Sequence, residues 1–408
     1  MDVSHDSRVL MPISNPLGGI KTYILSYARY LGETGFRFTF LAPEGKKFAC
    51  FQEEAASFPD VEFINVPGGA STKKMVVAIR RAMKTGRFSL VHSQGLKAGF
   101  QTALANWGIC IPHVMTLHDV ILPQNDIPGR FKWFKKRLLG YTTKFIDHII
   151  AVTDDCRENH LQLFPQWKKG PCKVETVLNG IDLDKLLFPN NSDSPANSNS
   201  SVNFDSPARI REEFGFDPEM ILIGFFGRFM PQKGFLPLLE SLEILADRGY
   251  QHRIRLIATR DDFGYGEYFE KIRSSETLQN MVRLVSPQNN IASLILQMNL
   301  VVMPSLWEAC SLVSMEAMIL GVPFLGSRCI GIREVIRDTP SRSHQPDDPV
   351  SLADAIEEYI NHPWDEEARA FAPIARQRFD VRNGVRQVEK IYRSLERNLE
   401  HGGSRDLK

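Results

Sequence analysis

The sequence predicts an α/β protein built from two doubly wound parallel-sheet domains, and three observations carry this prediction. Short apolar, β-rich segments alternate with longer helical patterns along the 408 residues. The alternation stops at a polar segment, 190–207, and then starts again. The strand segments are almost continuously apolar, which is typical of parallel sheets covered by helices on both faces. A hydrophobic content of 43% is enough for two cores.

The first domain is expected to span 1–180. Its predicted strands are the apolar runs at 8–13, 37–42, 61–66, 88–93, 113–118 and 148–153. Between them, apolar residues recur at helical spacing, which predicts helices at 20–32, 73–84, 95–106 and 130–145.

The segment NNSDSPANSNSSVNFDSP (190–207) is rich in Ser, Asn, Asp and Pro and cannot bury a core. We therefore expect an interdomain linker at 181–207 and a second domain at 208–382. Its predicted strands are 221–227, 253–259, 281–286, 299–304 and 322–327. A charged helix at about 383–402 ends the pattern, and we expect it to pack back onto the first domain.

Composition excludes several functions. The net charge of +1 gives no nucleic-acid signal. The six cysteines are scattered without a CxxC pair or Cys/His cluster, which favours reduced thiols and argues against a zinc site. The N-terminus lacks a signal-peptide pattern, and no run of about 18 uncharged apolar residues occurs. We therefore expect a cytoplasmic protein without membrane spans.

In doubly wound sheets, ligands bind outside the carboxyl ends of the strands, so we expect a site in a cleft between two facing domains. Gly18 and Gly19 follow the first strand and precede a helix, where backbone N–H groups can approach an anion. The pair also fits a turn that merely needs glycine. His118 ends another strand and can hydrogen-bond a sugar hydroxyl, or simply cap the strand.

Two cations follow the first strand of the second domain. Arg228 comes directly after it, and Lys233 comes five residues later. Together they suit a diphosphate, because Arg forks across oxygens and Lys acts as a point charge. A diphosphate leaving group needs such help as its negative charge grows. The alternative is a solvated turn with incidental charges.

Two acids, Glu308 and Glu316, lie in the apolar stretch PSLWEACSLVSMEAMILGVP. Ser311 is a reasonable N-cap for a helix that contains Glu316. Eight helical residues span about 12 Å, which suits the two ends of a nucleotide-sugar. A glycosidase pair, with carboxyls ~5–9.5 Å apart, is the alternative, but it does not explain the cations.

Together these residues resemble the retaining nucleotide-sugar glycosyltransferases of the GT-B fold, specifically glycosyltransferase family 4. The hallmark of that family, Glu followed by seven residues and Glu, is matched by Glu308 and Glu316. The other matching motifs are the glycine loop Gly18-Gly19, His118-Asp119, Asn179 to Asp182, the G-R-x-x-x-x-K-G stretch 227–234, and Gly331 with Glu334.

The resemblance implies a role for each residue on the donor side. Arg228 and Lys233 would bind the donor diphosphate, and Glu316 would hold the ribose hydroxyls. Glu308 would contact the donor sugar near the reacting centre. The turn that follows it, Ala309, Cys310, Ser311 and Leu312, would lie against the sugar or phosphate.

In the first domain, the backbone at Gly18 and Gly19 would approach the phosphate or the acceptor, and His118 would contact the transferred sugar. The resemblance implies transfer with retention, without a cofactor or a metal. The acceptor would be a glycan or a lipid-linked molecule, in cell-surface polysaccharide or glycoconjugate synthesis.

One departure from the family pattern motivates an alternative. The family usually has Gly-Phe-Gly after the first glutamate, whereas this chain has Ala309, Cys310 and Ser311. The bulkier turn would reshape the sugar pocket, so a catalytically inactive nucleotide-sugar-binding protein of the GT-B fold stays open. An oxidoreductase on Rossmann folds is disfavoured, because the chain lacks a G-x-G-x-x-G fingerprint.

Two stretches combine basic and apolar or aromatic residues, at 73–87 and 130–144. Such surfaces dock proteins on anionic membranes with about 1 kcal/mol per charge, so peripheral membrane contact is one interpretation. The other is two solvated helix faces whose apolar sides belong to the core.

Overall fold

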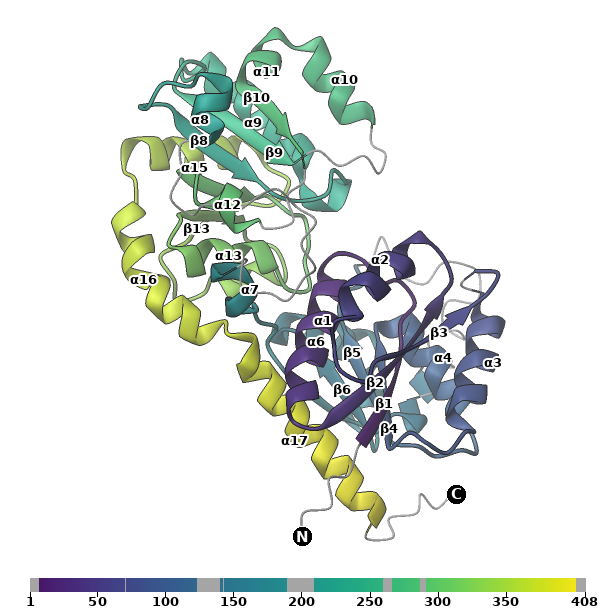
Figure 1. The fold of residues 1–408 in the computed structure, drawn as a ribbon. Coiled ribbons are helices and arrows are strands. Elements are labelled where there is room, and N and C mark those ends of the chain that lie inside the picture. The colour runs from purple at the N-terminus through teal and green to yellow at the C-terminus, as the bar shows by residue number, and fades with distance from the viewer. Residues whose placement is uncertain are drawn as a thin grey trace. The chain divides into compact units, whose positions relative to one another are not determined.

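The computed structural model describes residues 7–69, 71–122, 140–141, 143–188, 209–259, 266–286 and 291–400 (Figure 1). The chain divides into two compact units. The first comprises Met1–Gly180 and Val381–Lys408, and the second comprises Ile181–Asp380. The polar segment 190–207 and most of the predicted helix 130–145 lie outside the described residues.

The first unit contains a seven-stranded parallel sheet in the order β3-β2-β1-β4-β5-β6-β7. The order reverses between β1 and β4, which is the topological switch point of a doubly wound sheet. The strands are β1 (Ser7–Pro12), β2 (Phe36–Pro43), β3 (Glu62–Val66), β4 (Leu90–Gln94), β5 (His113–Leu117), β6 (His148–Ala151) and β7 (Lys173–Thr176).

Helices cover both faces of this sheet because successive residues of β1 serve opposite cores. Val9 and Met11 pack with α1, α2 and α17, whereas Leu10 packs with α3 and α4. The helices of the unit are α1 (Gly18–Glu33), α2 (Lys46–Ala55), α3 (Thr72–Met83), α4 (Leu96–Asn106), α6 (Asp154–Leu163) and α17 (Val381–Glu400), with short 3-10 turns η2 (Thr143–Phe145) and η3 (Pro165–Lys168).

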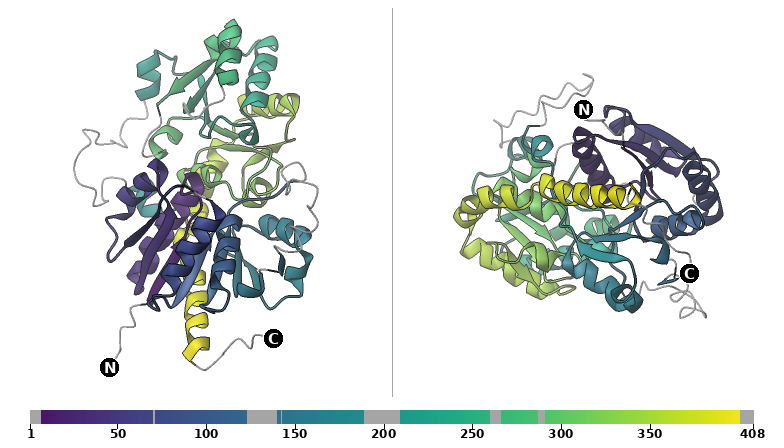
Figure 2. Two further views of the ribbon diagram at one scale, coloured as in Figure 1. Left: turned by 90° about the vertical axis from the view of Figure 1, so that its right-hand side faces the viewer. Right: turned by 90° about the horizontal axis from the view of Figure 1, so that it is seen from below.

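Helix α17, yellow in Figure 2, runs alongside the strands of the first unit and belongs to its core. Its buried residues Val381, Val385, Val388 and Tyr392 recur at helical spacing and form one apolar stripe. A Cβ at Gly384 would overlap with the hydroxyl of Tyr27 in α1. The glycine therefore allows the close approach of α17 to α1.

The second unit repeats the architecture with six parallel strands in the order β10-β9-β8-β11-β12-β13. The switch point lies between β8 and β11. The strands are β8 (Ile221–Phe225), β9 (Ile254–Thr259), β10 (Val282–Val285), β11 (Leu300–Met303), β12 (Phe324–Ser327) and β13 (Arg342–His344).

Helices α9 and α15 pack together over the core of this sheet, which includes Ile223 and Phe225. Helix α13 packs against β11 and β12. The helices of the unit are α7 (Leu183–Leu187), α8 (Arg209–Phe214), α9 (Phe235–Asp247), α10 (Gly266–Ser274), α11 (Glu276–Met281), α12 (Ala292–Ile295), α13 (Leu312–Leu320), α14 (Ile332–Val335), α15 (Pro349–Asn361) and α16 (Asp365–Arg378), with a 3-10 turn η5 (Pro231–Lys233).

The prediction of two doubly wound parallel sheets is confirmed. The sequence patterns did not predict the edge strands β7 and β13 or helix α2. The segment 181–188, predicted as linker, contains α7 and belongs to the second unit. Within the described residues, no helix is long and apolar enough to cross a membrane.

Gly384→Ala tests the packing of α17, because helix propensity predicts that the substitution stabilises the protein, whereas packing predicts that it destabilises it. Ala is favoured over Gly inside a helix by about 1 kcal/mol. We nevertheless expect Gly384→Ala to lower the melting temperature, because Tyr27 is buried and stacked on Tyr23, with ring centroids 3.9 Å apart, and cannot yield. Overpacking of this kind costs about 1–3 kcal/mol.

The matched control is Gly32→Ala in α1, where a new Cβ meets nothing within 4 Å. This variant is expected to melt at or above the temperature of the parent protein. Equal melting temperatures for the two alanine variants would contradict the packing of α17 against α1.

Candidate functional site

The loop that joins β11 to α13 is held by the two turns beside it. The Leu306 N–H donates to the Gln232 carbonyl at 2.8 Å, and the Gln232 side chain donates to the Trp307 carbonyl at 3.0 Å. On the other side, the Glu308 N–H donates to the Ile330 carbonyl at 3.1 Å. The loop 304–308 therefore lies fixed between the turns that follow β8 and β12.

Two glycines with left-handed backbones make this packing possible. Gly234 has φ +68° and Gly331 has φ +87°. A Cβ at Gly234 would overlap with the Pro304 carbonyl, and one at Gly331 would overlap with the Glu308 carbonyl. Because both obstacles are backbone atoms, no side-chain movement would relieve the overlap. These positions require glycine in both conformation and space.

The predicted site residue Glu308 is buried, with 6% of its surface exposed, but its charge is compensated. Its Oε1 lies 2.5 Å from Nζ of Lys233 and accepts a hydrogen bond from Oγ of Ser305 at 2.9 Å. A paired and hydrogen-bonded carboxylate avoids most of the penalty of burial. The structure thus joins one predicted cation to one predicted acid across 75 residues.

Arg228 differs from Lys233, although both lie in the turn that follows β8. Its side chain is exposed. It makes no hydrogen bond or ion pair with the residues that the structure describes. No described residue therefore occupies the donors of this guanidinium, and its planar fork suits phosphate oxygens.

Glu316 lies in the second turn of α13, about 6 Å along the axis from the first helical residue, Leu312. Burial raises the pKa of this carboxyl from 4.5 to about 7. Across the described part of the chain, its carboxylate has no hydrogen-bond or ion-pair partner. A half-buried acid without a partner is a good acceptor for ligand hydroxyls.

The turn between the two acids takes the form that the sequence predicts. Ser311 is the N-cap of α13, and its Oγ accepts from the Ser314 N–H at 3.4 Å. Ala309 is buried, and Cys310 is half-buried. The start of the helix is therefore intact, although Ala309, Cys310 and Ser311 stand where the family usually has Gly-Phe-Gly.

In the first unit, Gly18 and Gly19 open α1 and are exposed. Gly18 has φ +54°, and Leu17, which precedes it, offers no side-chain cap. The first N–H groups of α1 are therefore not capped by that side chain and lie at the switch point of the sheet. A helix N-terminus in this state favours an anion.

His118 follows β5 at the same sheet edge. Its Nε2 lies 2.8 Å from Oε1 of Gln94, and its ring meets the ring of Tyr23 edge-on, with centroids 4.7 Å apart. Burial lowers the pKa of His118 to about 3, so the imidazole is neutral at physiological pH. It therefore acts as a hydrogen-bonding group and not as a fixed cation.

His92 has a different environment. Its Nδ1 lies 2.5 Å from the Tyr392 hydroxyl of α17, and its Nε2 lies 2.7 Å from Oγ1 of Thr116. Both nitrogens are occupied within the unit, so this histidine supports the fold.

Sequence analysis did not identify Ser305 and Gln94 as site residues. Ser305 is the second residue after β11, and Gln94 is the last residue of β4. Each is a polar residue at a carboxyl strand end, and each binds a predicted site residue. A systematic inspection of every polar residue at these strand ends would have found both.

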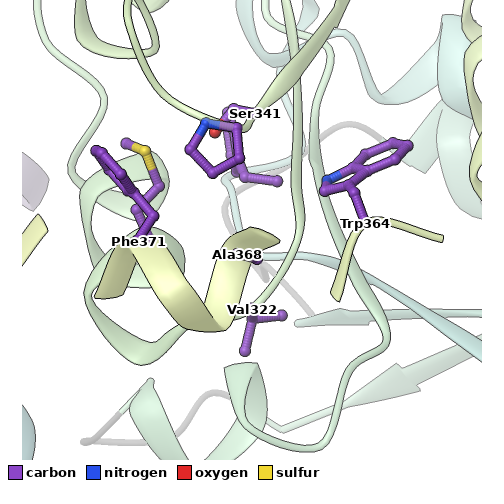
Figure 3. Close-up of a pocket in the computed structure, with 8 residues that line it drawn as sticks. Val322, Ser341, Trp364, Ala368 and Phe371 are labelled. Carbon is purple, nitrogen blue, oxygen red and sulfur yellow. The ribbon is translucent and has the colours of Figure 1, made fainter. Parts of the chain in front are cut away.

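Two cavities within the described residues are lined by residues other than the predicted ones. Figure 3 shows one that is lined by residues of α13 and α16, with the indole nitrogen of Trp364 facing it. Its volume of about 10 Å³ admits one water molecule. An open groove of about 460 Å³ lies between α10 and β10. No group of three or more His, Cys, Asp or Glu among the described residues is arranged to hold a metal.

Comparisons with known proteins agree with this geometry. A family model for "Glycosyltransferase Family 4" matches residues 17–185, and one for "Glycosyl transferases group 1" matches 207–378. A D-inositol 3-phosphate glycosyltransferase from Frankia alni is 25% identical, over 95% of this chain and 97% of the relative. One from Streptosporangium roseum is 23% identical, over 97% and 93%.

Solved structures share the fold along nearly the whole chain. A glycosyltransferase from Rickettsia africae has a TM-score of 0.77 at 17% identity, covering 97% of this chain and 100% of that one. Anabaena HepE in complex with UDP has a TM-score of 0.75 at 20% identity, covering 95% and 100%. WaaG, a glycosyltransferase involved in lipopolysaccharide biosynthesis, has a TM-score of 0.67 at 16% identity, covering 94% and 99%.

The first half of the chain thus matches a model of glycosyltransferase family 4 and the second half a model of glycosyl transferases group 1, in a fold shared with solved glycosyltransferases. The protein is a glycosyltransferase of family 4, with the GT-B fold.

Proposed function

We propose that this glycosyltransferase moves a sugar from a nucleoside-diphosphate-sugar donor to a glycan or lipid-linked acceptor, with retention of anomeric configuration. The observation that carries the proposal is the turn after β8. There, the guanidinium of Arg228, which has no partner among the described residues, accompanies the ion pair of Lys233 and Glu308 at the switch point of the second sheet. A doubly wound sheet binds its ligand at this point.

Arg228 and Lys233 bind the diphosphate in this proposal, and Glu316 accepts hydrogen bonds from the ribose hydroxyls. The structurally similar HepE was solved with UDP and with UDP-glucose, which supports a nucleotide-sugar donor and makes uridine the first base to test. The first N–H groups of α1, at Gly18 and Gly19, approach the phosphate or the acceptor.

The chemical step breaks the bond between the anomeric carbon and the donor phosphate. Negative charge grows on the leaving diphosphate, and Arg228 stabilises it. The acceptor hydroxyl attacks from the same face, and the leaving phosphate takes its proton. Glu308 and the neutral His118 contact the transferred sugar, beside the turn Ala309 to Leu312. No metal or other cofactor takes part in this scheme.

The proposed acceptor is inferred from the relatives of the chain. The names of relatives, which include D-inositol 3-phosphate glycosyltransferases and WaaG of lipopolysaccharide biosynthesis, favour a role in cell-surface polysaccharide or glycoconjugate synthesis. Acceptor contacts are assigned to the first unit, because the donor residues lie in the second.

Peripheral contact with the cytoplasmic face of a membrane is a further part of the proposal. Within 73–87, two arginines are engaged in the fold: Arg80 donates to the carbonyls of Ala105 and Trp107, and Arg87 pairs with Glu62. Lys73, Arg81 and Lys84 remain exposed. Most of 130–144 lies outside the described residues. Co-sedimentation with vesicles that contain anionic lipid would test the contact.

A catalytically inactive nucleotide-sugar-binding protein is the second candidate, motivated by the turn Ala309-Cys310-Ser311. Detectable turnover of a donor would eliminate it. The oxidoreductase alternative is wrong, because the chain belongs to glycosyltransferase family 4.

A thermal-shift panel of UDP, GDP, ADP, CMP and their sugar conjugates tests the donor site. A ligand that binds the folded state raises the melting temperature by mass action. We expect one nucleoside diphosphate to stabilise the protein and Arg228→Ala to weaken its binding at least tenfold. This loss of affinity corresponds to the removal of one charge-assisted hydrogen bond, which contributes about 1.5–3 kcal/mol. The control is Arg337→Ala, an exposed arginine of the same unit. Equal losses in both variants would remove Arg228 from the site.

Alanine substitutions at Glu308 and Glu316 should have different effects, one on sugar transfer and the other on donor binding. We expect Glu316→Ala to weaken donor binding. Glu308→Ala should slow transfer by about a hundredfold, since it removes an interaction with the reacting sugar worth about 2.7 kcal/mol. It should not weaken UDP binding, because Lys233 is then released from its carboxylate partner. Steady-state kinetics and calorimetry with UDP measure the two effects. Parental values in both variants would overturn the assignment.

The pKa of Glu316 predicts how stability depends on pH. In the unfolded chain this carboxyl ionises near 4.5, and in the folded protein near 7. The folded state therefore favours the protonated form, and the contribution to stability is full below pH 4.5 and lost as pH rises through 7. We expect Glu316→Gln to melt above the parent protein at pH 8. The difference should vanish near pH 4.5. A difference that does not change with pH would contradict the raised pKa.

A further inference from the structure

Ser305 is fully buried and is fixed at both ends. Its Oγ donates to Oε1 of Glu308 at 2.9 Å, and its backbone carbonyl accepts a hydrogen bond from the Ser327 hydroxyl. The first bond ties the serine to the proposed sugar-contacting acid. The second ties it to the end of β12, a strand of the sheet itself.

Among the described residues, the hydrogen-bond donors that contact the carboxylate of Glu308 all reach the same oxygen atom. Lys233 and Ser305 both bind its Oε1. Its Oε2 has no hydrogen-bond partner among the residues that the structure describes. Two donors on one oxygen fix the plane of the carboxylate and leave the lone pairs of the other oxygen for a ligand.

The two donors differ in what they can hold once a donor substrate binds. Lys233 has a long, flexible side chain whose ammonium is also assigned to the diphosphate. A bound diphosphate therefore competes with Glu308 for it. Ser305 has a short side chain, lies wholly inside the protein and carries no charge. It keeps its contact with Glu308 whichever partner Lys233 takes.

We propose that Ser305 is a positioning residue for Glu308, which it holds so that one carboxylate oxygen faces the transferred sugar. The inference rests on the proposed function, in which Glu308 contacts that sugar. Because an ionised carboxylate only accepts hydrogen bonds, the sugar face presented to Oε2 carries hydroxyl donors.

The test is Ser305→Ala, with Ser241→Ala as the matched control. Ser241 is equally buried and also loses one hydrogen bond, from its Oγ to the Leu238 carbonyl at 2.7 Å, but it does not touch Glu308. Turnover is measured with the nucleotide-sugar that stabilises the parent protein, starting with UDP-glucose, and affinity is measured with UDP.

We expect Ser305→Ala to lower kcat about tenfold and to change the affinity for UDP less than twofold, because Ser305 acts on the sugar end of the donor. Ser241→Ala should leave both quantities unchanged. In a Glu308→Ala background, adding Ser305→Ala should cause no further loss of kcat, since the two residues act as a unit. An independent tenfold loss in that background would overturn the proposal.

Crystal structures of the parent and of Ser305→Ala supply a readout that does not depend on the donor. The Glu308 carboxylate should change its rotamer or occupy two orientations in the variant. An unmoved carboxylate, together with unchanged kcat, would refute the role of Ser305. If the parent bound no nucleotide and transferred no sugar, the proposed function would fail, and a moved carboxylate would still show that Ser305 positions Glu308.

Discussion

The ion pair of Lys233 and Glu308 is the interaction on which the candidate site depends. It joins the turn after β8 to the loop after β11, across the point where the strand order of the second sheet reverses. Each charge compensates the other, so both can lie partly or wholly buried at this sheet edge. The glycines at 234 and 331 allow the surrounding backbones to approach closely enough for the pair to form. Charge pairing and backbone packing are therefore two parts of one arrangement.

The arrangement divides the charged residues of the second unit into two kinds. Glu308 and Lys233 form an ion pair with each other. Arg228 and Glu316 have no such partner within the described residues, and the proposed donor substrate would supply one. Burial raises the pKa of Glu316. Two glutamates of the same motif thus differ in their partners: Glu308 pairs with Lys233, and Glu316 reaches no basic side chain among the described residues.

Much of the fold follows from the periodicity of apolar residues, and the elements that the sequence patterns did not predict share physical reasons for it. The central strands are apolar on both sides and stand out in the sequence. The edge strands β7 (KVET) and β13 (RSH) are short and polar, because an edge strand has a neighbour on one side only. Helix α2 buries only Phe48, Phe51 and Ala55, too few positions for a clear helical pattern.

The site shows the same division between local and long-range information. Motif residues such as Glu308 and Arg228 stand at strand ends and were identified from spacing. The pairing of Glu308 with Lys233 could not be predicted from the sequence, because the two residues are far apart in the chain and the pairing depends on how separate turns pack. The contacts of Ser305 and Gln94 were missed for the same reason. Side-chain partners across a sheet edge are a property of the tertiary structure.

The placement of α17 has a consequence for synthesis of the protein on the ribosome. The last helix completes the core of the first unit, whereas residues 181–380 form the second unit as one uninterrupted segment. The two connections lie side by side, with Ile181 bridged to Asp380. The second unit is therefore an insertion within the first, and its own sheet can close while the chain is still growing. The first sheet is made earlier, but the apolar surface of α1 that α17 covers stays open until residues 381–400 have been made.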